Sequence, residues 1–261
     1  MVDFSAAEYG VYTLYGCKLV PRAVIRMSID DAEHYTPEQR AAIIASYPAH
    51  EREARANGIP TLGSGRIFPV SDDQIAVDAP DCPKHWVHIG GIDFGWDHPT
   101  AAVHAAWDRD HDCVYVLNAY RVSQEPVVIH AAALKAWGKG LQWAWPHDGN
   151  NDTAAGKNLA SQYREHGLAF LPDRATFEDG SNSVEAGIMD MLDRMKTGRL
   201  KVARNLTDWF DEFRMYHRKD GKIVKERDDL MSATRYAIMM LRFARPVKEA
   251  EWGQTDTRWV V

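Results

Sequence analysis

The strongest constraint on the fold is the alternation of short apolar runs and helical segments from Trp86 onward. The run from Trp86 to Asp93 predicts a buried strand that ends in a glycine-rich loop. Two further strands, at 101–107 and 113–119, are separated by a polar turn of hairpin length. Helix and strand signals then alternate up to a last helix at 228–244. This order predicts an α/β architecture with a mixed sheet.

The remaining elements of this region follow the same pattern. Helices are predicted at 126–138, 157–166, 183–197 and 206–213, and strands at 141–147, 169–171 and 200–202. The pair Asp220-Gly221 predicts a hairpin with a type I′ turn within 214–225.

Residues before position 80 show no regular alternation of strand and helix signals, because prolines recur through them. Thr36, Pro37 and Glu38 predict the start of a helix that continues to Ser46, and a second short helix is expected at 51–56. We therefore expect an irregular linker region at 1–80, the α/β domain at 81–246 and a flexible tail at 247–261.

Composition is typical of a globular protein, with 45% hydrophobic and 26% charged residues. The apolar stretches are far shorter than the ~20 residues that cross a bilayer, and no signal peptide is visible, so we expect no membrane role.

Cys17, Cys82 and Cys113 form no CxxC pattern, which indicates reduced thiols in a cytosolic protein. The net charge of -6 argues against coating of nucleic acid by bulk positive charge.

Acidic residues follow two of the predicted strands. Asp93 ends the first strand inside Gly91-Ile92-Asp93-Phe94-Gly95, and Asp148 follows the strand at 141–147. Each aspartate alone has a simpler explanation as a turn residue. Together, two carboxylates at neighbouring strand ends repel each other unless a cation lies between them, which favours a metal site.

A third carboxylate comes from the last helix. Asp229 shares a face with Ala233 and Ala237, which is expected to pack on the sheet, whereas Asp228 lies nearer solvent. Both aspartates would also suit a helix N-terminus without any further role. Oxygen ligands without a cysteine cluster favour Mg or Mn, and two such ions about 4 Å apart can hydrolyse a phosphodiester.

Stretches at 90–101, 145–149, 184–187 together with 198–200, and 228–237 resemble the C-terminal nuclease part of the large terminase subunit of tailed double-stranded DNA phages. The stretch at 25–70 is similar to the join between ATPase and nuclease in that family. No segment fits G-x-x-x-x-G-K-[ST], since 149–158 has the wrong spacing, so we expect a shortened form of the gene product without an ATPase motif.

The resemblance implies an RNase H-like fold and an endonuclease that cuts concatemeric double-stranded DNA during viral genome packaging. It places the catalytic, metal-binding triad on Asp93, Asp148 and Asp229, with Asp228 as the alternative third ligand and two Mg or Mn ions as cofactors. It also implies the portal protein and the small terminase subunit as partners, in the host cell cytoplasm. Asp97 and His147 lie in matched loops, either as groups that orient the metal ligands or as ordinary surface turn residues.

Basic residues gather in the hairpin that precedes Asp229. The expected DNA contacts are Arg214, Arg218, Lys219, Lys222 and Lys225. They would hold the phosphate backbone without reading sequence, although a solvated hairpin face is the simpler alternative. Two other functions stay open: an RNase H or junction-resolving nuclease of the same fold, and a non-catalytic docking module of the packaging motor.

Overall fold

The computed structural model describes residues 11–15, 18–22, 27–47, 52–56, 65–150 and 158–247. The chain divides into two units, Met1–Gly63 and Ser64–Val261. The predicted tail at 247–261 lies outside the described residues except for Val247.

The first unit holds a hairpin and three short helical segments among its described residues. Strands β1 (Val11–Tyr15) and β2 (Lys18–Arg22) pair antiparallel, followed by a 3-10 turn at Ile29–Asp31 and the helices α1 (Pro37–Ser46) and α2 (Arg52–Ala56). The start of α1 confirms the sequence prediction. Thr36 and Gln39 form a reciprocal capping box, and Pro37 is the first helical residue.

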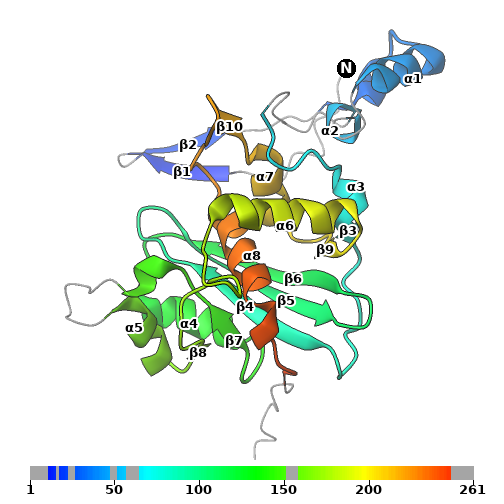
Figure 1. Ribbon diagram of the computed structural model, residues 1–261. Coiled ribbons are helices and arrows are strands. Elements are labelled where there is room, and N and C mark those ends of the chain that lie inside the picture. Colours follow the sequence, from blue (N-terminus) through cyan, green and yellow to red (C-terminus); the bar gives the residue numbers. More distant parts are fainter. Residues whose placement is uncertain are drawn as a thin grey trace, which may run out of the picture. The chain divides into compact units, whose positions relative to one another are not determined.

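A seven-stranded mixed sheet organises the second unit (Figure 1). Strand β5 runs against the other strands of this sheet, because it pairs antiparallel with both β4 and β6 while the remaining pairs are parallel. In spatial order the strands are β3 (Ala76–Val77), β9 (Leu200–Ala203), β6 (Cys113–Val122), β5 (Thr100–Asp108), β4 (Val87–Asp93), β7 (Gln142–Ala144) and β8 (Ala169–Phe170). The predicted mixed α/β sheet is therefore confirmed.

Helices cover both faces of this sheet (Figure 1). Gly90 and Gly91 face opposite sides of β4, one against the Trp143 indole and the other against the last long helix. The α-helices described in this unit are α3 (Asp72–Ile75), α4 (Val127–Lys135), α5 (Leu159–Glu165), α6 (Val184–Lys196), α7 (Thr207–Met215) and α8 (Asp229–Met239). Helices α6 and α7 both pack against α8.

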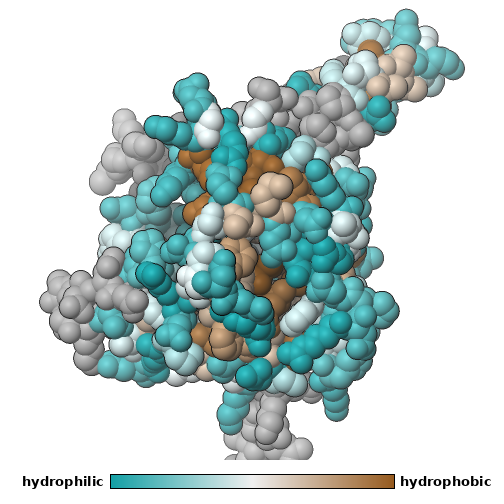
Figure 2. All heavy atoms as spheres, viewed as in Figure 1, coloured by the Kyte–Doolittle hydropathy of each residue, from teal (hydrophilic) through white to brown (hydrophobic). Residues whose placement is uncertain are grey.

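The core lies between these layers and is continuous across the sheet. Three tryptophans, Trp143, Trp145 and Trp209, are among its largest fully buried side chains. On the face shown in Figure 2, hydrophilic side chains cover most of the surface, and hydrophobic ones show through where α6 and α8 lie. Val184 and Met189 of α6 are among the exposed hydrophobic residues.

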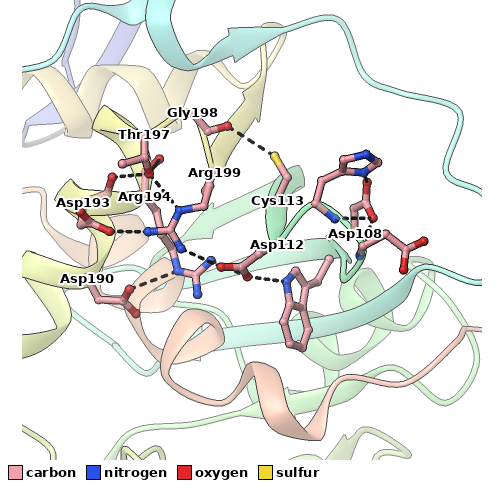
Figure 3. Close-up of polar contacts among 12 residues, drawn as sticks. Asp108, Asp112, Cys113, Asp190, Asp193, Arg194, Thr197, Gly198 and Arg199 are labelled. Carbon is pink, nitrogen blue, oxygen red and sulfur yellow. Dashed lines mark hydrogen bonds and ion pairs between the residues drawn. The ribbon is translucent and has the colours of Figure 1, made fainter.

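A network of ion pairs ties the β5–β6 turn to the end of α6 (Figure 3). Asp112 accepts hydrogen bonds from Arg194 (3.1 Å) and Arg199 (2.7 Å). Arg194 also pairs with Asp190 at 3.2 Å, and Arg199 pairs with Asp193. The network holds the residues that precede β9 beside the start of β6, with which β9 pairs.

The hairpin before α8 confirms its predicted turn type. Strands β10 (Arg218–Lys219) and β11 (Lys222–Ile223) flank Asp220 and Gly221, whose φ angles are 51° and 76°. Positive φ at both central positions defines the type I′ turn.

Several bounds differ from expectation, and β7 is shorter than the strand expected at 141–147. The division after Gly63 falls earlier than residue 80, because β3 joins the sheet beside β9 and α3 packs against both strands. Strand β6 runs on to Val122, past the predicted end at 119. Helix α8 ends at Met239, and a 3-10 turn at Leu241–Phe243 follows in place of the predicted helical residues up to 244.

Candidate metal centre

Asp93 and Asp148 lie at the carboxyl ends of two neighbouring strands, at the same edge of the sheet. Strands β4 and β7 are parallel neighbours, with Gly90 opposite Trp143 and Gly91 opposite Ala144. Asp93 is the last residue of β4, and Asp148 lies in a 3-10 turn shortly after β7. Both side chains are partly buried. The carboxyl ends of neighbouring parallel strands are the usual place for ligand-binding groups in α/β sheets.

Helix α8 brings the third acidic residue to this edge. A Cβ on Gly91 would lie only 2.1 Å from the carbonyl oxygen of Ala233, so the helix backbone lies directly on β4. Asp229 begins the helix one turn before Ala233, about 6 Å along its axis. Asp93 lies two residues beyond Gly91, roughly 7 Å along the strand. The close approach at Gly91 therefore sets how near Asp229 comes to Asp93.

The electrostatics of Asp93 show that the acidic residues act on one another. Burial, and then the charges of Asp148, Asp229 and Asp228, raise the pKa of Asp93 to about 8. Burial followed by the charge of Asp229 also raises the pKa of Asp228. These carboxylates thus lie near enough for their like charges to oppose one another.

Asp229 and Asp228 differ in their surroundings. Asp229 is 7% exposed, whereas Asp228 is half-buried, as the helical spacing predicts. Asp229 Oδ2 accepts a hydrogen bond from Arg121 Nη2 at 3.3 Å, so its carboxylate is oriented by an arginine on β6. Lys225 and His98 both lower the pKa of Asp228, against the burial that raises it.

Glu212 completes this part of the site and was not anticipated from the sequence. It is 2% exposed, its Oε1 lies 2.7 Å from Arg121 Nε, and its Oε2 accepts a hydrogen bond from the Leu230 amide at 2.7 Å. Glu212 of α7 thus caps α8, because Asp228 at the N-cap position makes no side-chain cap hydrogen bond. Burial raises the pKa of Glu212 to about 7.

A sequence signal for Glu212 does exist. It occupies the buried face of α7 together with Trp209 and Phe213. A glutamate on an otherwise aromatic helix face needs a buried partner. Arg121 carries no comparable signal, because it lies at the end of a strand where charged residues are common.

The donor set fits a hard divalent cation. All candidate ligands are carboxylate oxygens, the type that Mg and Mn prefer. Asp148 Oδ1 is buried and has no hydrogen-bond partner within the described ranges. Yet no three acidic, histidine or cysteine side chains there are arranged as a metal-ligand set.

Asp97 and His147, the candidates for orienting the metal ligands, are both exposed at the surface. They lie in the β4–β5 loop and in the turn that carries Asp148. Neither position distinguishes a role beside the metal from that of an ordinary surface turn residue.

The basic residues expected to contact DNA fall into two groups, and Arg214 lies in α7 rather than in the hairpin. Arg214 pairs with Asp72 at 2.6 Å and with Asp211 at 2.8 Å, and Arg218 forms a two-pronged pair with Glu185. The three hairpin lysines are exposed: Lys219, Lys222 and Lys225. The lysines are therefore the better candidates for contact with phosphate.

Two further sequence expectations can be compared with the structure. No helix among the described residues has the length and apolar character that crossing a membrane requires. Cys82 and Cys113 are free thiols, and Cys17 lies outside the described residues.

Comparison with known proteins places this arrangement in a family. The family described as "Terminase RNaseH-like domain" matches residues 90–241, and "Terminase large subunit, T4likevirus-type, N-terminal" matches residues 11–75. The large terminase subunit of Salmonella phage P22 is 49% identical over 228 residues, which cover 87% of this chain and 46% of that protein. The subunit of Enterobacteria phage LP7 is 49% identical over 219 residues, 83% of this chain and 46% of that protein. The chain thus spans a little under half the length of these relatives.

Solved structures agree with the sequence matches. The P22 large terminase nuclease domain is similar with a TM-score of 0.66 and 44% identity, over 70% of this chain and 95% of that one. The large terminase of a thermophilic bacteriophage shares the fold at 16% identity and a TM-score of 0.54, over 82% of this chain and 55% of that one. The chain therefore belongs to the terminase RNaseH-like domain family.

Proposed function

We propose that this chain is a divalent-metal-dependent endonuclease that cuts concatemeric double-stranded DNA during viral genome packaging. The observation that carries the proposal is the gathering of carboxylates from β4, the turn after β7 and α8 at one edge of the sheet. Such a cluster lowers the stability of the folded protein unless cations bind to it. Membership of the terminase family and the likeness to the P22 nuclease domain support the assignment to packaging.

Asp93, Asp148 and Asp229 would hold the metal, with Asp228 as the alternative third ligand. Two bound Mg or Mn ions would activate a water and stabilise the leaving oxygen of the cleaved phosphodiester. Arg121 orients Asp229, and Glu212 fixes the start of the helix that carries it. The protein thus contributes an oriented set of oxygen ligands.

The DNA backbone would be held by the exposed lysines of the β10–β11 hairpin. Lys225 lies near enough to lower the pKa of Asp228, so this end of the hairpin is beside the acidic cluster. Lys219 and Lys222 lie opposite each other across the hairpin and add exposed positive charge. Contacts of this kind give affinity without sequence preference. Arg214 and Arg218 would contact DNA by exchanging their acidic partners for phosphate.

The partners and setting follow from the family. We propose that the portal protein and the small terminase subunit bind the whole large subunit, in the host cell cytoplasm. Because the chain spans 46% of the length of its P22 relative, these interactions belong to the longer protein in that comparison.

Cleavage of a supercoiled plasmid tests the function directly. The wild-type chain should cut in the presence of Mn and lose activity in a chelator, and Asp148→Asn should be inactive. Asp110→Asn, which changes an exposed aspartate in the β5–β6 turn, is the matched control and should cut normally. Equal cleavage by wild type and Asp148→Asn would contradict the proposal.

The same assay separates the alternative functions. Faster cutting of an RNA–DNA hybrid or a four-way junction than of linear duplex would favour a ribonuclease H or a junction-resolving nuclease. The docking-module alternative predicts that Asp93→Ala and Asp229→Ala leave every cleavage rate unchanged.

A further inference from the structure

The loop that follows Asp93 carries a large aromatic side chain that is exposed to solvent. Trp96 is 59% exposed. The other tryptophans in the described ranges are buried or partly buried: Trp86, Trp107, Trp137, Trp143, Trp145 and Trp209. Packing within the domain therefore explains these six indoles but leaves the exposure of Trp96 unexplained.

The loop that carries Trp96 is held in place by hydrogen bonds. The Gly95 amide donates to Thr100 Oγ1 at 3.3 Å, and the Thr100 hydroxyl donates to the Gly95 carbonyl at 2.9 Å. The Gln124 amide donates to the Trp96 carbonyl at 3.0 Å, which ties the loop to the end of β6. A Cβ on Gly95 would lie 2.2 Å from the His98 carbonyl oxygen, so the turn is also tightly closed. The fold thus keeps the indole at the surface.

Trp96 lies beside the residues proposed to bind metal. It follows Asp93 by three positions in the loop that leaves β4. Phe94, two residues before Trp96, packs on the turn that carries Asp148, since a Cβ on Gly149 would lie 2.7 Å from the Phe94 ring. This loop therefore borders the acidic cluster, and a bound strand would pass over it.

We propose that Trp96 is a DNA-contacting residue whose indole packs against the backbone sugars next to the cleaved phosphate. This inference rests on the proposed function and deepens it. Every nucleotide presents the same sugar, so the contact would add affinity without sequence preference. It would also need no charge, which suits a position beside carboxylates that repel the phosphate backbone.

The uncharged nature of the contact gives a distinguishing prediction. Lysine contacts release counterions, so their contribution to affinity falls as salt rises. An indole contact releases none. Trp96→Ala should weaken duplex binding by about tenfold at both low and high salt, because burying one apolar indole face contributes on the order of that factor. Lys222→Ala should weaken binding mainly at low salt and reduce the salt dependence.

Binding is measured with the full chain carrying Asp148→Asn, so that DNA is not cut, by fluorescence anisotropy of a short labelled duplex with Mn. Cleavage is measured with chains that keep the native Asp148. Trp96→Ala should raise KM about tenfold and leave kcat within about twofold of wild type. Trp96→Phe should restore most of the affinity, since it keeps an aromatic face. Ile129→Ala, at a residue 47% exposed on α4, is the control and should match wild type.

Two outcomes would overturn the inference. Trp96→Ala that binds and cuts like wild type shows that the indole has no role with DNA, and wild-type cleavage in the same experiment keeps the proposed function intact. Unchanged DNA binding together with lost binding to another packaging protein would assign Trp96 to a protein interface. Thermal unfolding of each variant confirms that it is folded before the comparison.

Discussion

Replacing Asp93 with asparagine should stabilise the metal-free protein while abolishing cleavage. The pKa of Asp93 is raised from 3.8 to about 8, first by burial and then by the charges of its acidic neighbours. A carboxyl group whose pKa is higher in the folded state binds its proton more tightly there than in the unfolded chain. Folded stability therefore falls as pH rises from about 4 to about 8.

The size of this effect follows from the pKa difference. The difference between 3.8 and about 8, at about 1.36 kcal/mol per pKa unit, would cost the folded state roughly 6 kcal/mol above pH 8. The side chain is partly exposed, so water screens part of this cost, and we take about half. Asparagine has nearly the same shape and no charge. We therefore expect Asp93→Asn to gain about 3 kcal/mol at pH 8 and less than about 1 kcal/mol at pH 5.

Urea unfolding in a chelator at both pH values measures the gain, with Asp110→Asn as a control that should show none. Adding Mn should then stabilise the wild type more than the variant, because the ions bind to the charge that asparagine lacks. The reasoning is refuted if Asp93→Asn is no more stable than wild type at pH 8, or if its advantage does not grow between pH 5 and pH 8.

Three further predictions follow from the packing and the polar contacts. Gly91→Ala should lower Tm by several degrees and reduce cleavage, because the new methyl group must push the Ala233 carbonyl away; an unchanged Tm in calorimetry would contradict this. Glu212→Ala should cost about 3 kcal/mol in urea unfolding, since the Leu230 amide and a partly buried arginine both lose a partner. Glu212→Gln should cost clearly less, because it still accepts the amide, and equal losses would argue against capping. Asp112→Ala should cost about 1 kcal/mol at low salt and less in 1 M NaCl, and a loss that ignores salt would show that the ion pairs contribute little.

The sheet could be predicted because its central strands carry strong local signals. The run Trp86 to Asp93 is apolar, ends in glycines and has the length of a strand, and β4 forms there as Val87–Asp93. Strand β3 could not be predicted in the same way. It has only two residues, too few for any periodicity, and it exists because β9 lies beside it.

The end of α8 shows a similar limit. Its apolar pattern continues towards Ala244, so the sequence predicts helix to that point, but the helix ends at Met239. The Arg242 guanidinium hydrogen-bonds to the carbonyls of Met239 (2.8 Å) and Thr176 (2.9 Å). The Arg242 side chain thus satisfies a carbonyl at the end of the helix. Its second partner, Thr176, lies far away in the sequence.

The acidic residues were the predictable part of the candidate site, and their supports were not. Asp93 and Asp148 follow apolar strands, and Asp229 begins a helix, so each is marked by its own neighbours in the chain. Arg121 and Glu212 contact Asp229 and its helix from β6 and α7. Such contacts between distant segments leave no periodic trace. The metal ligands themselves remain a prediction until cleavage by the variants is measured.

The missing side chain at Gly91 has a consequence for how such a protein can change over time. The gap between β4 and α8 is set there by one main chain resting on another, with only the small Ala237 methyl group beside the contact. Exchanges among apolar residues elsewhere in the interior can then alter packing while the separation of Asp93 from Asp229 stays the same. Substitutions in the rest of the core can therefore accumulate without changing the distance between these two carboxylates.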